Sequence, residues 1–221
     1  MVDYKKPDHW QQRARKEGYP ARSVYKLIEI DEKFGLFKKL RPASGTASGR
    51  STSAELRVLD LGAAPGSWSL YALRKMAGSG FLASCDLSPL SREFDNGLFD
   101  GGNFFFIQGD ITTVEIREPL FAKGPYSTII SDAAPATTGS HIVDAARSLE
   151  LAETVVNYAE GALFRGGNLA LKVFQGGSSA ALLKRIKTLF ETAKSFKPQA
   201  CRGESVETYY IGLNFTGNSP H

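Results

Sequence analysis

Four aspartates in the sequence stand at or beside the ends of short apolar segments, where their carboxylates are placed to serve a ligand. Asp60 lies within LRVLDL (56–61), and Asp86, Asp110 and Asp132 come at or just after the ends of the next three such segments. In open parallel sheets, ligands bind beyond the C-terminal ends of the strands. A single aspartate there often caps the following helix. Three on successive strand ends beside a Gly/Pro loop indicate a ligand site.

The loop after the first segment, LGAAPGSW (61–68), consists mainly of small residues, which let the backbone approach a ligand closely. It lacks the GxGxxG spacing of dinucleotide sites, which disfavours a nicotinamide dehydrogenase. An adenosine-type cofactor without a pyrophosphate fits better. Asp86 is placed to accept hydrogen bonds from a ribose diol, and Asp110, after Gln108-Gly109, is suited to an adenine edge.

A lysine inside an apolar run is the second chemical feature. Lys172 stands within GGNLALKVF (166–174). An unpaired buried lysine is costly, so a lysine at such a position favours a function. An amine acts as a base only when it is neutral, and burial and neighbouring positive charge both favour the neutral form. Lys172 is therefore a candidate base.

The elements that must position these residues alternate along the chain. Strands are predicted at 56–61, 81–87, 103–110, 126–132 and 166–174, and helices from the Gly/Pro turn to about Met76, at about 143–163 and at 178–193. This alternation predicts an α/β fold with a mostly parallel sheet and helices on both faces. VETYYIGLNF (206–215) is rich in β-formers and follows a short segment near Ser195–Pro198 with no helix between, so a hairpin is expected to add an antiparallel strand.

The N-terminal segment is basic. Residues 1–41 hold eleven Lys/Arg and six Asp/Glu, a net of +5, whereas the remainder is at −1 and the whole chain at +4. This segment is predicted to be helical over 9–41, with a break at Tyr19-Pro20. Its charge suits a polyanionic partner such as nucleic acid, and the alternative is a solvated basic helix. Residues 43–54, ASGTASGRSTSA, are predicted to be a flexible surface insertion.

The remaining composition narrows the class of protein. A length of 221 residues with 42% hydrophobic content suits one α/β domain over 1–221, with its catalytic core at 56–215. Two cysteines give no disulfide framework and no four-ligand zinc site, and the three histidines have no ligand spacing, so no metal is expected. No apolar run is long enough to span a bilayer and no secretory signal is recognised, so a cytoplasmic location is expected.

Several segments together resemble one family. They are VLDLGAAPGSWSLYAL (58–73), SDAAPATTGSHIVD (131–144), GGNLALKVFQGG (166–177) and KPQACRGESVETYYIG (197–212), preceded by YPARSVYKLIEIDEKFGLFK (19–38). In this order and spacing they resemble the FtsJ/RrmJ family of ribose 2′-O-methyltransferases over nearly the whole chain. The resemblance implies a Rossmann-like class I methyltransferase fold, with a seven-stranded, mostly parallel sheet containing one antiparallel strand. It also implies S-adenosylmethionine as the cofactor.

Site residues follow from the same resemblance. It implies a catalytic tetrad of Lys26, Asp132, Lys172 and Glu207. It implies cofactor contacts from Gly66, Trp68, Asp86, Asp110 and Asp132. Without it, Lys26 reads as a helix surface residue, Glu207 as a solvent-facing strand residue and Trp68 as core. Ser67 departs from the family, which often has a second glycine there.

The function implied is S-adenosylmethionine-dependent methylation of a ribose 2′-hydroxyl in RNA, with a uridine of 23S ribosomal RNA in the large ribosomal subunit as the expected target. A monomer is expected, with no membrane or DNA partner. Two alternatives remain open at this point. One is 2′-O-methylation of a tRNA or an mRNA cap, and the other is a non-catalytic RNA-binding factor in ribosome assembly.

Overall fold

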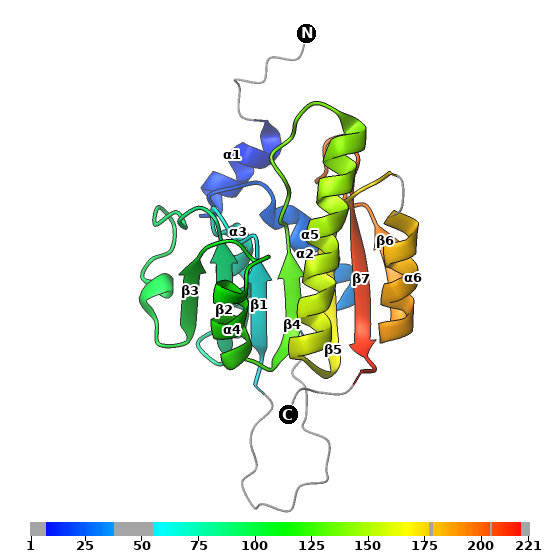
Figure 1. Ribbon diagram of the computed structural model, residues 1–221. Coiled ribbons are helices and arrows are strands. Elements are labelled where there is room, and N and C mark those ends of the chain that lie inside the picture. Colours follow the sequence, from blue (N-terminus) through cyan, green and yellow to red (C-terminus); the bar gives the residue numbers. More distant parts are fainter. Residues whose placement is uncertain (1–7, 38–54, 177–178, 204, 218–221) are drawn as a thin grey trace, which may run out of the picture.

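Seven strands form a single sheet in the computed structural model of the chain, which describes residues 8–37, 55–176, 179–203 and 205–217 (Figure 1). The strands are β1 (Arg57–Leu61), β2 (Phe81–Asp86), β3 (Phe104–Gln108), β4 (Tyr126–Ser131), β5 (Leu163–Phe174), β6 (Phe190–Phe196) and β7 (Glu207–Phe215). The helices are α1 (His9–Lys16), α2 (Val24–Phe34), α3 (Ser67–Met76), α4 (Val114–Ala122), α5 (His141–Ala162) and α6 (Ser179–Leu189), with a short 3-10 helix at Leu98–Asp100. The insertion predicted at 43–54 lies outside the described residues.

The strand order is β3-β2-β1-β4-β5-β7-β6. β1 pairs in parallel with β2 and β4, β2 with β3, and β4 with β5. β7 pairs antiparallel with both β5 and β6. Within the described part of the chain, β7 is thus the one strand that runs against the others. The predicted fold class, a seven-stranded sheet with one antiparallel strand, is confirmed.

Helices cover both faces of this sheet. α1, α2 and α3 pack on one face and α4, α5 and α6 on the other (Figure 1). Side chains of a strand alternate between the faces. In β5, Leu169 and Leu171 therefore enter the core under α4 to α6, and Ala170 enters the core under α1 to α3. By this alternation Lys172 lies on the side of α1 to α3.

The N-terminal segment forms two helices rather than one. α1 ends at Lys16, and the break predicted at Tyr19-Pro20 is confirmed. α2 ends at Phe34 because Gly35 adopts the left-handed conformation (φ 62°) that terminates helices. The prediction of helix was therefore wrong for residues 35–37, and its last residues, 38–41, lie outside the described part.

Two other predictions need correction. The helix predicted at 178–193 ends at Leu189, and Phe190–Phe196 is the edge strand β6. Phe190 packs against Phe215 and the strand pairs along β7, so a tertiary pairing overrides the helical pattern. α4 was not predicted, and it contains Pro119, a residue that usually marks a helix boundary.

Candidate active site

The register of β4, β5 and β7 places polar side chains from the three segments next to one another. Ser131 of β4 is opposite Leu171 of β5, which places Asp132 beside Lys172 at the end of the strand. Lys172 is in turn opposite Tyr209 of β7. Because β7 is antiparallel, its first residues lie at the same edge of the sheet as the last residues of β4 and β5. Sheet pairing alone thus brings three segments far apart in sequence to one place.

Lys172 is held by Asp132. Its Nζ donates to the Asp132 backbone carbonyl at 2.6 Å and lies 3.0 Å from the Asp132 carboxylate Oδ1. The side chain of Lys172 is 9% exposed and that of Asp132 is 17% exposed. The amine is therefore fixed in position with little access to water, as a reacting group requires.

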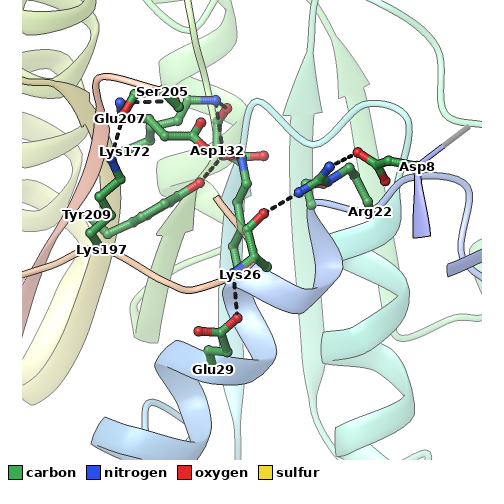
Figure 2. A network of polar contacts seen from close by, with 12 residues as sticks. Asp8, Arg22, Lys26, Glu29, Asp132, Lys172, Lys197, Ser205, Glu207 and Tyr209 are labelled. Carbon is green, nitrogen blue, oxygen red and sulfur yellow. Dashed lines mark hydrogen bonds and ion pairs between the residues drawn. The ribbon is translucent and has the colours of Figure 1, made fainter. Parts of the chain in front are cut away.

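A second ion pair joins the two remaining members of the expected tetrad. Lys26 Nζ lies 2.8 Å from Glu207 Oε1, and both side chains are nearly buried. Lys26 comes from α2, which covers this face, and Glu207 is the first residue of β7, on the same side of the strand as Tyr209. The four residues implied by the resemblance are thus brought together from four elements as two ion pairs (Figure 2).

Tyr209 belongs to this cluster and the sequence reasoning missed it. Its hydroxyl donates to Asp132 Oδ1 at 2.7 Å (Figure 2). Burial, followed by the nearby charge of Asp132, raises the pKa of Tyr209 well above its usual range, so the phenol keeps its proton as a donor. Its position two residues after Glu207 was an available signal, since such residues share a strand face.

Asp132 is ionised in this setting. Burial by itself raises the pKa of its carboxyl, but the positive charges of Lys172 and Lys26, and the hydrogen bond from Tyr209, outweigh that effect and hold the pKa below its usual range. An ionised carboxylate only accepts hydrogen bonds. Asp132 therefore orients both Lys172 and Tyr209 as donors toward itself.

The loop after β1 lies against the same cluster. Gly62 has φ +78°, and a Cβ there would come within 2.5 Å of the Ala133 Cα, so only glycine allows this close approach to the residue after Asp132. On the other side, the Ala64 amide donates to Asp86 Oδ2 at 2.9 Å. The loop is thus held between the ends of β2 and β4.

Acidic residues lie around this loop: Asp86 and Asp132, which were predicted to contact the cofactor, and Asp60, which was not. Asp60 is completely buried, and burial above all, opposed by a hydrogen bond from Ser69, raises its pKa to about 7. Asp60 Oδ2 accepts that bond at 2.7 Å, while Oδ1 has no partner among the described residues. Asp86 and Asp132 act electrostatically on Asp60. Three neighbouring acidic groups, one with an unpartnered buried oxygen, fit a cationic ligand such as S-adenosylmethionine.

The other three predicted cofactor residues differ in what they offer. Gly66 precedes α3 with φ +108°, and a Cβ there would press on the Phe99 ring at 3.1 Å. Asp110 is exposed, with Oδ1 accepting from Thr112, so part of its carboxylate serves its own turn. The Trp68 side chain is buried, and its indole donates to the Ser23 carbonyl at 2.9 Å, which leaves its backbone for a cofactor contact.

Across 8–37, 55–176, 179–203 and 205–217, no group of three or more His, Cys, Asp or Glu side chains is arranged to hold a metal ion. In the same residues, no helix has the length and apolar character needed to cross a membrane.

Comparison with known proteins relates this geometry to a family. The model of the FtsJ-like methyltransferases matches residues 19–215, which include all members of the two ion pairs. The chain belongs to the FtsJ-like methyltransferase family. Methyltransferases of this family use S-adenosylmethionine, so the protein is a methyltransferase with that cofactor, and a nicotinamide dehydrogenase is excluded.

Individual relatives are similar along almost their whole length. The ribosomal RNA large subunit methyltransferase E of Treponema denticola is 45% identical over 97% of this chain and 98% of its own. The protein of the same name from Oleidesulfovibrio alaskensis is 42% identical over 95% and 92%. Among solved structures, a Plasmodium falciparum protein assigned as a ribosomal RNA methyltransferase is 25% identical, with a TM-score of 0.69 over 90% of this chain and 100% of that chain.

Proposed function

We propose that the protein transfers a methyl group from S-adenosylmethionine to a ribose 2′-hydroxyl in the RNA of the large ribosomal subunit, with Lys172 as the base. The observation that carries the proposal is the placement of Lys172 Nζ, held by Asp132 beside the cofactor loop with most of its surface buried. Relatives that match nearly the full length are named for large-subunit ribosomal RNA. Their names favour that substrate over a tRNA or an mRNA cap.

Methyl transfer to a ribose hydroxyl requires that the hydroxyl oxygen be aligned with the methyl group and that one group accept the hydroxyl proton. The cofactor supplies a methyl group already activated by a positive sulfur. The cofactor would be held by Gly66, Asp86, Asp110, Asp132 and the backbone of Trp68. A ribose hydroxyl is a weak nucleophile, so aligning its oxygen with the methyl group supplies a large part of the rate.

Lys172 would take the proton of the 2′-hydroxyl at Nζ. Its Nζ is held by the carbonyl and the carboxylate of Asp132. Asp132 then fixes where the amine points, and Glu207 holds Lys26 within reach of the same centre. A pair of substitutions at Lys172 tests its role as the base.

The test is single-turnover methylation of large-subunit RNA by Lys172→Ala and Lys172→Arg. Loss of a general base costs about 10²–10⁴-fold, and arginine, which stays protonated, should be nearly as slow as alanine. Both variants should still bind cofactor and RNA. A Lys172→Arg enzyme close to the wild-type rate would refute the base and leave Lys172 with a purely electrostatic role.

The substrate has its own test. Mapping 2′-O-methyl sites in RNA from cells with and without the protein should show one missing site in large-subunit RNA. A missing site in tRNA would contradict the proposed substrate but not the proposed 2′-O-methylation.

We infer that the protein acts as a monomer in the cytoplasm, where its ribosomal substrate would lie.

A further inference from the structure

The carboxylate of Glu29 binds two consecutive backbone amides in the loop between β6 and β7. Glu29 Oε2 accepts from the Gln199 amide at 2.6 Å, and Oε1 accepts from the Ala200 amide at 2.8 Å. These are the two central amides of a turn that the Cys201 amide closes by donating to the Pro198 carbonyl at 3.1 Å. One carboxylate therefore satisfies both outward-facing donors of a single turn.

Arg22 binds the same turn from the other side. Its guanidinium donates to the Ala200 carbonyl at 2.5 Å and is itself paired with Asp8. Ala200 is completely buried. The peptide groups around Ala200 are thus held at both N–H and C=O by side chains that come from one short segment, residues 22–29.

Lys26 lies between these two anchors. Lys26 and Glu29 are three residues apart on α2, a spacing that places their side chains on one side of the helix, and Arg22 lies in the turn just before α2. The turn they hold leads within six residues to Glu207, the partner of Lys26. Lys197 closes the base of the loop by donating to the Ser205 carbonyl at 2.7 Å. Both ends of the Lys26–Glu207 pair are therefore set by how α2 is attached to this turn.

The attachment is separate from the packing that holds α2 on the sheet. Val24, Leu27 and Ile30 are completely buried in the core under α1 to α3. Glu29 is half-buried and is not one of the residues of that core. Its loss should leave the helix in place and release the turn.

We propose that Glu29 is a positioning residue for methyl transfer. It holds the turn 198–201 against α2 and so keeps Lys26 and Glu207 at the distance and orientation of their ion pair. The inference rests on the proposed function. Misplacement by about 1 Å in an active site can cost on the order of 10²-fold in rate. Residues 60–132, which would hold the cofactor, are not part of this attachment, so cofactor affinity should be unaffected.

The experiment measures the single-turnover rate of Glu29→Ala at saturating cofactor and RNA, with cofactor affinity measured by calorimetry. We expect the rate to fall by about 10-fold or more and cofactor affinity to stay within about 2-fold. Glu32→Ala is the matched control, because Glu32 is exposed on the same helix one turn further on. It should leave both quantities unchanged. A rate for Glu29→Ala within about 2-fold of wild type, or a parallel loss of cofactor binding, overturns the proposal.

A double-mutant cycle separates positioning from general destabilisation. If Glu29 acts through the ion pair, adding Glu29→Ala to Glu207→Gln should cost little beyond Glu207→Gln alone. Full multiplication of the two losses would refute the inference. Should Glu29→Ala fail to fold, Glu29→Gln replaces it, since its amide keeps one acceptor but sets an NH₂ group against the other donor. It should then show a smaller loss in the same direction, and a wild-type rate would overturn the proposal.

Amide hydrogen exchange at Gln199 and Ala200 reports on the attachment without any activity. Exchange there should accelerate in the Glu29 variants and not in Glu32→Ala. Faster exchange with an unchanged rate would refute the positioning role. A wild-type protein that does not methylate large-subunit RNA at all would refute the proposed function instead, whatever the exchange shows.

Discussion

Asp60→Asn removes a carboxyl group that the fold buries completely beside the cofactor loop. Its pKa is raised from 3.8 to about 7, chiefly by burial. Below about pH 4 the carboxyl is protonated in both the folded and the unfolded chain, so it has no pH-dependent effect. Between about pH 4 and pH 7 the unfolded chain releases this proton while the folded chain retains it. The folded state therefore loses stability as the pH rises through this window.

The size of the loss follows from the shift. Each pKa unit is worth about 1.4 kcal/mol, so a shift from 3.8 to about 7 amounts to about 4 kcal/mol at pH 8. Asparagine cannot ionise, and its carbonyl can still accept the Ser69 hydrogen bond. Asp60→Asn should therefore unfold at a higher temperature than wild type at pH 8, by about 10 °C for a chain of this size. At pH 4.5 the difference should shrink to about 1 kcal/mol, roughly a quarter of its size at pH 8.

Thermal unfolding followed by circular dichroism at both pH values is the assay. Asp100→Asn is a control, because it changes the net charge equally at an exposed position and should shift the melting temperature little. The reasoning is refuted if Asp60→Asn is no more stable than wild type at pH 8, or if its gain is the same at pH 4.5. Either result would mean that the buried carboxylate has a compensating partner.

Two further predictions concern binding. Asp86→Ala should weaken S-adenosylmethionine binding by about 10-fold or more, because the substitution removes a hydrogen-bond acceptor for the ribose and leaves the Ala64 amide without its partner. An unchanged affinity in calorimetry would show that Asp86 does not bind the cofactor. Charge reversal of the exposed Arg15 and Lys16 of α1 should weaken RNA binding and lower its salt dependence, while cofactor binding stays unchanged. The same charge reversal at the exposed Lys184 and Lys187 of α6 should leave RNA binding unchanged. Equal effects of the two pairs would mean that α1 is an ordinary solvent-exposed helix and does not bind RNA. The Arg15 contact to Glu93 is an exposed ion pair worth at most about 1 kcal/mol, so its loss should not obscure the result. Lys5 and Lys6, which share the N-terminal charge, lie outside the described residues.

Much of the central sheet is predictable from local sequence. β1, β2 and β4 are short segments rich in apolar and small residues, as expected of parallel strands that are buried on both faces. The glycines of the loop after β1 signal a close backbone approach, and Lys172 is conspicuous because a lysine in such a run is costly to bury. These signals depend on neighbouring residues alone, so a single sequence contains them.

The partners of those residues were decided by tertiary structure. Lys26 meets Glu207 across 180 intervening residues, and nothing in the local pattern of either residue indicates the pair. Tyr209 reaches Asp132 only because the β5–β7 register sets it opposite Lys172. Residues 190–193 pair with β7 as a strand despite a helical pattern, since the gain from cross-strand packing exceeds a weak local preference. The periodicity of apolar side chains can be read from the local sequence. Strand register and the contacts between helices and loops, in contrast, arise only when distant segments pack together.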